Sequence, residues 1–165
     1  MNQLHTSPFS ALRQTALTAL CQDLSLARAL VVGQEDFLTA VPSESEQALL
    51  EAPDALLWER ILPYRRDFDQ QAAATPLLCL SFEEVKKTGA KYAGGYLYLY
   101  CFVPTALEKT AYGRRSDYLI DRATAILDDP GGAIGRLRFY ARGDRAVFTG
   151  CTGQYVAFET TQLLL

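Results

Sequence analysis

The sequence predicts an α+β fold in which a mixed or antiparallel sheet of about four to five strands carries two main helices packed on one face. Three observations favour this fold. Residues 75–103 hold two strands that are apolar at nearly every position, and amphipathic helical patterns lie before and after them. Two further strand patterns close the chain, which gives the order helix, uncertain segment, two strands, helix, two strands.

The first helix is predicted over residues 8–23. Ser7 and Pro8 are a typical helix start, with Ser at the N-cap and Pro at the first helical position. Apolar residues then recur at helical spacing, namely Phe9, Leu12, Ala16, Leu20 and Leu24. Residues 1–7 are expected to form a flexible tail ahead of this helix.

The segment 33–54 is predicted to be an insertion or a surface segment. It is rich in Ser, Glu and Ala and contains Pro42 and Pro53, and a short helix over residues 44–51 is one alternative. The next run, residues 55–64, carries Trp58, the one tryptophan of the chain, which we expect to be anchored in the core. Helix and strand both fit this short apolar run.

Two strands are predicted at residues 76–85 and 94–103, joined by a polar loop over residues 83–95. Because strand side chains alternate between two faces, the second strand has one aromatic face, formed by Tyr96, Tyr98, Tyr100 and Phe102. Its other face holds Leu97, Leu99, Cys101 and Val103. Helices can cover one face. The aromatic face is either buried inside the subunit or forms a subunit contact, since Tyr is enriched at interfaces.

The second main helix is predicted to follow residues 112–117 and to end at Asp128-Asp129-Pro130. Its apolar residues recur at helical spacing, namely Tyr118, Leu119, Ala123, Ile126 and Leu127. Two closing strands are predicted at residues 134–141 and 145–160, with Leu137 and Phe139 in the interior. The three leucines at residues 163–165 either finish the last strand or dock on a neighbour.

Composition predicts a single domain over residues 1–165, because this length is typical of one domain. A hydrophobic share of 49% and a charged share of 21% are typical of a soluble globular protein, and the net charge of -3 gives no general reason to expect nucleic-acid binding. The cysteines, at 21, 79, 101 and 151, form no CxxC pair and are expected to be small buried thiols in a reducing, intracellular setting. No signal peptide or membrane span is recognisable, so no membrane partner is expected.

The sequence favours no catalytic, cofactor or metal site, and we predict that the protein is not an enzyme. The one histidine, His5, lies in the expected tail. One histidine and four scattered cysteines offer no local pair of metal ligands. The acidic pairs Glu83-Glu84 and Asp128-Asp129 are interpreted as the start of a loop and the exit of a helix.

Two groups of charged residues are candidate contact residues. The first group, Lys86, Lys87 and Lys91, lies on the predicted loop, where the lysines are either solvated or touch a channel or a phosphate backbone. The second group, Arg114, Arg115 and Asp117, lies at the start of the second helix. These residues form ion pairs either within the subunit or across a subunit boundary, where Arg suits bidentate pairing with a carboxylate.

Several motifs occur in a fixed order between residues 56 and 162. They are Ile61-Leu62-Pro63-Tyr64, Thr75-Pro76-Leu77-Leu78, the strand from Tyr98 to Val103, Tyr112-Gly113-Arg114-Arg115-Ser116-Asp117 and Ile134-Gly135-Arg136-Leu137. This series resembles the neck and tail-terminator proteins of tailed bacteriophages and prophages. The most specific motif opens the second helix and resembles a Gly-x-Arg-x-Asp signature of small phage neck proteins.

The resemblance implies a tail terminator, which is a protein without catalytic residues or cofactors that forms a closed ring, usually a hexamer. Such a ring caps the tail-tube protein, joins it to the head-side connector or stopper protein, and lies in the virion after assembly in the bacterial host cytoplasm. The expected subunit interface contains Arg114, Arg115, Asp117, Tyr96, Tyr98 and Tyr100. Lys86, Lys87 and Lys91 are then expected at the rim or lumen of the ring, where they contact either the tail tube or, non-specifically, the DNA in the channel.

Other interpretations stay open. The protein could be a head-closure or neck adaptor, or the equivalent protein of a contractile injection system. Two further interpretations belong to different classes: a small cytosolic α+β enzyme or ligand-binding domain, and an adaptor that recognises its partner by adding a strand to its sheet edge.

Overall fold

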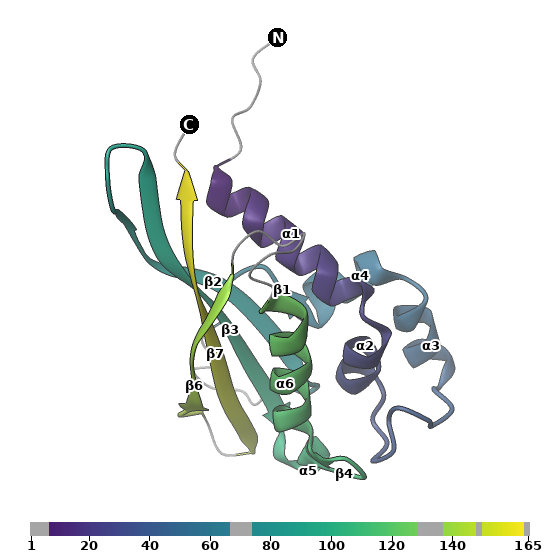
Figure 1. Cartoon of the computed structure of the whole chain (residues 1–165). Coiled ribbons are helices and arrows are strands. Elements are labelled where there is room, and N and C mark those ends of the chain that lie inside the picture. The colour runs from purple at the N-terminus through teal and green to yellow at the C-terminus, as the bar shows by residue number, and fades with distance from the viewer. Residues whose placement is uncertain (1–6, 67–73, 129–136, 148–149, 164–165) are drawn as a thin grey trace.

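The computed structural model describes residues 7–66, 74–128, 137–147 and 150–163, and it confirms the predicted α+β fold. Figure 1 shows the helices gathered on one side of a twisted sheet, from which a hairpin arm around residues 83–96 reaches away. Residues 159–163 pair alongside the second strand of this arm. The predictions for residues 1–6, with His5, and for Leu164 and Leu165 lie outside the described residues.

The main sheet has five strands among the described residues, in the order β1-β2-β3-β7-β6. These strands are β1 (Ile61–Leu62), β2 (Leu77–Lys87), β3 (Tyr92–Pro104), β6 (Arg138–Arg145) and β7 (Cys151–Leu163). The β1–β2 pair is parallel and the other pairs are antiparallel, so the sheet is mixed, as predicted. A separate small sheet pairs β4 (Lys109–Thr110) with β5 (Gly113–Arg114).

The helices are α1 (Pro8–Gln22), α2 (Leu24–Val31), α3 (Glu44–Leu50), α4 (Pro53–Glu59), α5 (Thr105–Glu108) and α6 (Arg115–Leu127). The two main predicted helices, α1 and α6, are confirmed, and both pack on the same side of the sheet (Figure 1). The first helix ends one residue earlier than predicted, because Asp23 caps a separate helix, α2, by accepting a hydrogen bond from the Leu26 amide.

The core lies between this helical layer and the aliphatic face of β3. Leu97, Leu99, Cys101 and Val103 are fully buried there, with side chains from α1, α2 and α6 around them. Burying a leucine contributes about 1.5–3 kcal/mol to folding, so this face holds the two layers together.

The segment 33–54 is anchored to the core as well as lying on the surface. Its short helix is confirmed as α3, which begins with a capping box between Ser43 and Glu46. Phe37 is completely buried, and its ring centroid lies 5.0 Å from those of both Tyr112 and Tyr118. This aromatic cluster ties the segment to the start of α6.

The predicted polar loop over residues 83–95 is wrong. β2 continues to Lys87 and β3 begins at Tyr92, so only residues 88–91 connect the two strands. Between residues 83 and 95 only Ala93 and Gly95 are buried, and neither belongs to the hydrophobic core. Strand pairing there therefore imposes no alternation of polar and apolar side chains. A bulge between Glu83 and Lys86 bends the arm, with Glu84 at a φ of 53°.

Two aromatic residues that we expected inside the protein are exposed. Trp58 is 63% exposed and has a φ of 80°, because the chain turns sharply from α4 into β1 and Leu56 is buried instead. Phe139 is 44% exposed, because it lies near the start of the edge strand β6. Leu137 is fully buried, as predicted.

Candidate interaction surface

The candidate site is a cluster of tyrosines on the side of the sheet opposite the main helices. We call it the tyrosine face, and its residues are Tyr96, Tyr98 and Tyr100 on β3, Tyr140 on β6 and Tyr155 on β7. Ring centroids are 4.6 Å apart for Tyr96 and Tyr140, 5.7 Å for Tyr98 and Tyr100, and 5.8 Å for Tyr98 and Tyr155. Three strands therefore contribute to one continuous aromatic surface.

The strand register explains why these rings meet. Tyr100 lies directly opposite Tyr155, so their side chains point to the same face. On the other side of β7, Tyr155 lies opposite Gly143 of β6, where an added Cβ would come within 2.9 Å of the tyrosine ring. Glycine at this position leaves the room that the ring of Tyr155 occupies.

The tyrosine face grades from a buried base to an exposed outer part. Tyr100 is only 3% exposed and packs in a small cluster with Leu62, Cys79 and Phe102. The described members of that cluster come from strands and connecting segments and not from the helices, because the cluster lies on the opposite side of the sheet. Tyr140 is 54% exposed, and Tyr96, Tyr98 and Tyr155 are half-buried. The rings accessible to a partner are therefore those of Tyr96, Tyr98, Tyr140 and Tyr155.

Tyr100 does not fit the interface role that we expected for it, because its side chain is already occupied within the subunit. Its hydroxyl donates a hydrogen bond to Glu83, and the guanidinium carbon of Arg145 lies 4.4 Å from its ring centroid. Burial and the bond to Glu83 raise the pKa of Tyr100, so the phenol stays protonated. Tyr100 fixes the base of the tyrosine face.

Arg115 is also wrong as an interface residue. Its side chain is 1% exposed, and its guanidinium donates to the carbonyl oxygens of Leu107, Ala29, Val32 and Gln34 at 2.7–2.9 Å. Burial lowers the pKa of Arg115 from its usual high value. The residue joins the end of α2 to α5 and α6 inside one subunit.

Arg114 and Asp117 make ion pairs within the subunit, which was one of the two predicted alternatives. Arg114 Nε lies 3.0 Å from a carboxylate oxygen of Glu108, and Asp117 accepts hydrogen bonds from Arg142 at 3.1 Å and from Gln154 at 2.7 Å. An additional role of Arg114 and Asp117 at a subunit boundary stays a prediction. Glu108, Arg142 and Gln154 gave no signal in the sequence, because they pair with residues on other elements.

The three candidate lysines lie at the far end of the β2–β3 arm. Lys86 and Lys87 are at the end of β2, Lys91 is in the connection to β3, and all three are exposed. Lys86 pairs with Gly94 and Lys87 with Ala93, so consecutive lysines point to opposite faces of the arm.

The cysteines are buried, as predicted, at positions 21, 79 and 101, and Cys151 is partly exposed. Burial raises the pKa of Cys21 and of Cys79 to about 11. Within the described part of the chain, no group of three or more His, Cys, Asp or Glu side chains is placed to hold a metal ion. Of the helices in that part, none combines the length and apolar character that a transmembrane span needs.

A family model described as YomW matches residues 23–160. The chain belongs to the YomW family. This family carries the name of a gene from a Bacillus phage or prophage, so the protein is phage-related. The YomW match includes the tyrosine face, the arm and Arg115. No curated protein and no solved structure matches the chain.

Proposed function

We propose that this phage-related protein is a non-enzymatic structural component of the virion, a tail terminator whose subunits form a ring at the junction of head and tail. The observation that carries the proposal is the tyrosine face. It is an aromatic surface formed by three strands, with exposed rings over a buried base. Such a surface favours contact with another protein.

The chemistry of tyrosine supports a role in assembly. Tyrosine rings contribute large apolar area, and their hydroxyls remain hydrated at the rim of a contact, which is why tyrosine is common at interfaces. Tyr96, Tyr98, Tyr140 and Tyr155 lie on one sheet face, while α1 and α6 form the opposite side of the subunit. Two unlike sides are what a head-to-tail contact in a closed ring requires.

The proposed ring, a hexamer by resemblance, lies on the end of the tail-tube protein and meets the head-side connector or stopper protein. The membership in a phage-related family supports this setting. In this arrangement the tyrosine face of each subunit is covered by the next subunit.

The double variant Tyr96→Ser, Tyr140→Ser tests the proposal. Both changes remove exposed or half-buried rings, so we expect the subunit to keep its fold, as judged by circular dichroism, and to lose self-association. Size is measured by multi-angle light scattering, for the chain alone and with the tail-tube protein of the same phage. Tyr112→Ser is the matched control, because Tyr112 is 40% exposed and lies outside the tyrosine face.

Electron microscopy of the same samples shows whether the assemblies are rings. A wild-type chain that stays monomeric at all concentrations, both alone and with the tail-tube protein, contradicts the proposed function. An unchanged assembly of the double variant contradicts the role of the tyrosine face.

A further inference from the structure

The tip of the β2–β3 arm presents apolar and basic side chains together. Val85 and Tyr92 are 47% and 51% exposed, and they lie next to Lys86, Lys87 and Lys91, which we call the tip lysines. Exposed apolar side chains on a projecting hairpin are unfavourable in water unless a partner covers them. The positive charges around them indicate that this partner is acidic.

An acidic groove lies between α3 and α4. It has a volume of about 500 Å³, and Val31, Ala48, Leu49 and Ala55 form its apolar lining. Its charged lining residues are Glu46, Glu59 and Arg60, and Arg60 lies 4.0 Å from the carboxylate of Glu59. The chain from residue 33 to 59 contains no Lys or Arg. Its acidic residues are Glu35, Asp36, Glu44, Glu46, Glu51, Asp54 and Glu59.

The groove and the arm tip match in chemistry. Each combines apolar side chains with charges that are mostly of one sign, positive at the tip and negative along residues 33–59. The exceptions are Glu84, which precedes Val85, and Arg60 at the groove. Glu46 is used within the subunit, because its carboxylate accepts hydrogen bonds from the amides of Ser43 and Gly33 at 2.7 and 2.8 Å. Glu59 lines the groove, Glu44 begins α3 and Glu51 directly follows it. All three are exposed and free of that capping role, and we call them the groove acids.

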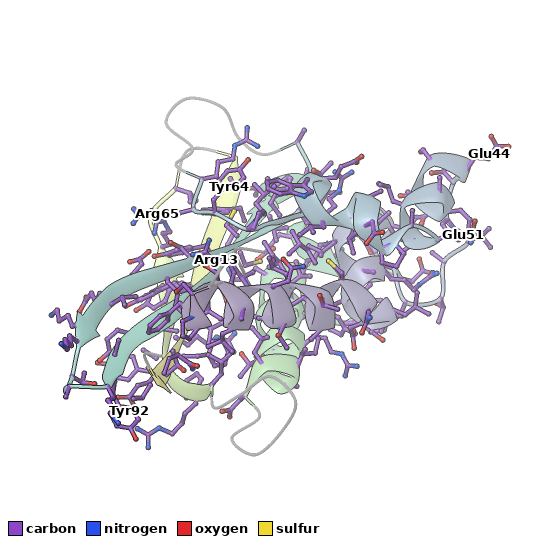
Figure 2. The ribbon with its side chains drawn as sticks, turned by 90° about the horizontal axis from the view of Figure 1, so that it is seen from above. Arg13, Glu44, Glu51, Tyr64, Arg65 and Tyr92 are labelled. Carbon is purple, nitrogen blue, oxygen red and sulfur yellow. The ribbon has the colours of Figure 1, made fainter. Side chains whose placement is uncertain are left out.

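The two surfaces lie at opposite ends of the subunit. Figure 2 shows Tyr92 at one end of the molecule and Glu44 and Glu51 at the other, and Figure 1 shows the same separation between the arm and α3. The arm of a subunit therefore lies far from its own groove, and a second copy is the partner that carries the complementary surface. Unlike patches at opposite ends generate a head-to-tail contact, which closes into a ring when the rotation between copies permits it.

We propose that the arm tip of one subunit docks in the α3–α4 groove of the next copy, with Val85 and Tyr92 against the apolar lining and the tip lysines against the groove acids. The inference rests on the proposed ring-forming function and names its second contact. It moves the tip lysines from the lumen of the ring to the contact between subunits. Burial of the apolar centre supplies affinity, and the opposite charges set the direction of the contact.

Charge reversal on each side provides the test. One variant carries Lys86→Glu, Lys87→Glu and Lys91→Glu, and the other carries Glu44→Lys, Glu51→Lys and Glu59→Lys. We expect each variant alone to self-associate about tenfold or more weakly than the wild type, since like charges then face each other. An equimolar mixture is expected to recover assembly, because each reversed tip meets a reversed groove and each native tip meets a native groove.

The single reversals Lys87→Glu and Lys109→Glu form a matched pair. Lys109 lies outside the arm, and its side chain is 86% exposed, so its reversal is expected to leave self-association unchanged while Lys87→Glu weakens it. Sedimentation velocity measures association, and circular dichroism checks that every variant is folded.

The outcomes separate this inference from the proposed function. If the wild type forms a ring and both triple variants form it equally well, the docking inference is overturned, while the proposed ring-forming function is supported. If the tip-reversed variant forms rings but loses binding to a double-stranded DNA probe, the tip lysines contact phosphate and the inference is again overturned. If the wild type never associates, with or without the tail-tube protein, both are overturned. Recovery in the mixture supports the inference.

Discussion

Arg115 holds together parts of the chain that are more than 80 residues apart in sequence. Ala29 and Val32 lie at the end of α2, where carbonyl groups have no partner within the helix, and the guanidinium of Arg115 donates to both. Its positive charge is also favourable at the negative end of the helix dipole. The same side chain stacks over Phe37, with its guanidinium carbon 4.8 Å from the ring centroid.

We predict that Arg115→Met lowers the free energy of unfolding by about 3–5 kcal/mol, because buried carbonyl groups lose their donor. Arg115→Lys is expected to recover little of this loss, since an ammonium group cannot reproduce the planar set of donors. Urea denaturation followed by tryptophan fluorescence measures the effect. Arg114→Ala, an exposed neighbour, is the control and should cost only about 0–1 kcal/mol. Equal stability of the Arg114 and Arg115 variants would contradict the structural role.

The contrast between Leu99 and Phe139 provides a second prediction. Leu99 is fully buried under the helices, so Leu99→Ala is expected to cost about 2–5 kcal/mol through loss of apolar burial and formation of a cavity. Phe139 is 44% exposed, so Phe139→Ala should cost less than half as much. Thermal and urea denaturation of the two variants measure the difference, and equal losses would show that Phe139 is a core residue.

At the scale of elements, periodicity in the sequence identified the parts of the chain that are buried on one side. The helices α1 and α6 and the strands β2, β3 and β7 were predicted because each packs against the core, which imposes its spacing on their side chains. The arm was missed because neither of its faces packs against the core there. Trp58 was misplaced because a left-handed residue interrupts α4, and hydrophobicity alone does not reveal such a turn.

The contact surfaces were only partly predictable for a related reason. The alternation of Tyr96, Tyr98 and Tyr100 indicated an aromatic face, but Tyr140 and Tyr155 joined it through strand pairing, which a single sequence does not display. The charge pattern around Arg115 looked like that of an exposed helix start. Its burial depends on carbonyl groups of α2 and the following turn, which are distant in sequence.

The pairing of β6 with β7 depends on close approach at Gly153. A Cβ there would lie 2.9 Å from the carbonyl oxygen of Arg145 and 2.7 Å from Val147 Cγ1, so the main chain of β6 would have to move. We predict that Gly153→Ala lowers the free energy of unfolding by about 1–3 kcal/mol. Gly89→Ala is the matched control, because a Cβ at Gly89 meets nothing within 4 Å. Urea denaturation of both variants measures the difference, and a stable Gly153→Ala variant would contradict this packing.

At the scale of the whole molecule, the subunit has one helical side and one aromatic sheet side, with a basic arm and an acidic groove at opposite ends (Figures 1 and 2). The net charge of -3 conceals this separation, because opposite charges at the two ends partly cancel in the total. A head-to-tail assembly would bury the aromatic side and bring the two charged ends together at each contact.

These two components of the contact should respond differently to salt. Raising sodium chloride from about 0.05 M to about 0.5 M shortens the Debye length from roughly 14 Å to roughly 4 Å, which weakens exposed charge pairs and leaves aromatic contacts nearly unaffected. We predict that self-association of the wild type, measured by sedimentation equilibrium, weakens across this range.

The neutral variant Lys86→Gln, Lys87→Gln, Lys91→Gln should associate more weakly than the wild type at low salt, and its association should change little as salt is raised. The variant Tyr96→Ser, Tyr140→Ser should associate more weakly at every salt concentration and keep the dependence on salt. A wild-type association that is indifferent to salt would assign the contact to the tyrosine face alone.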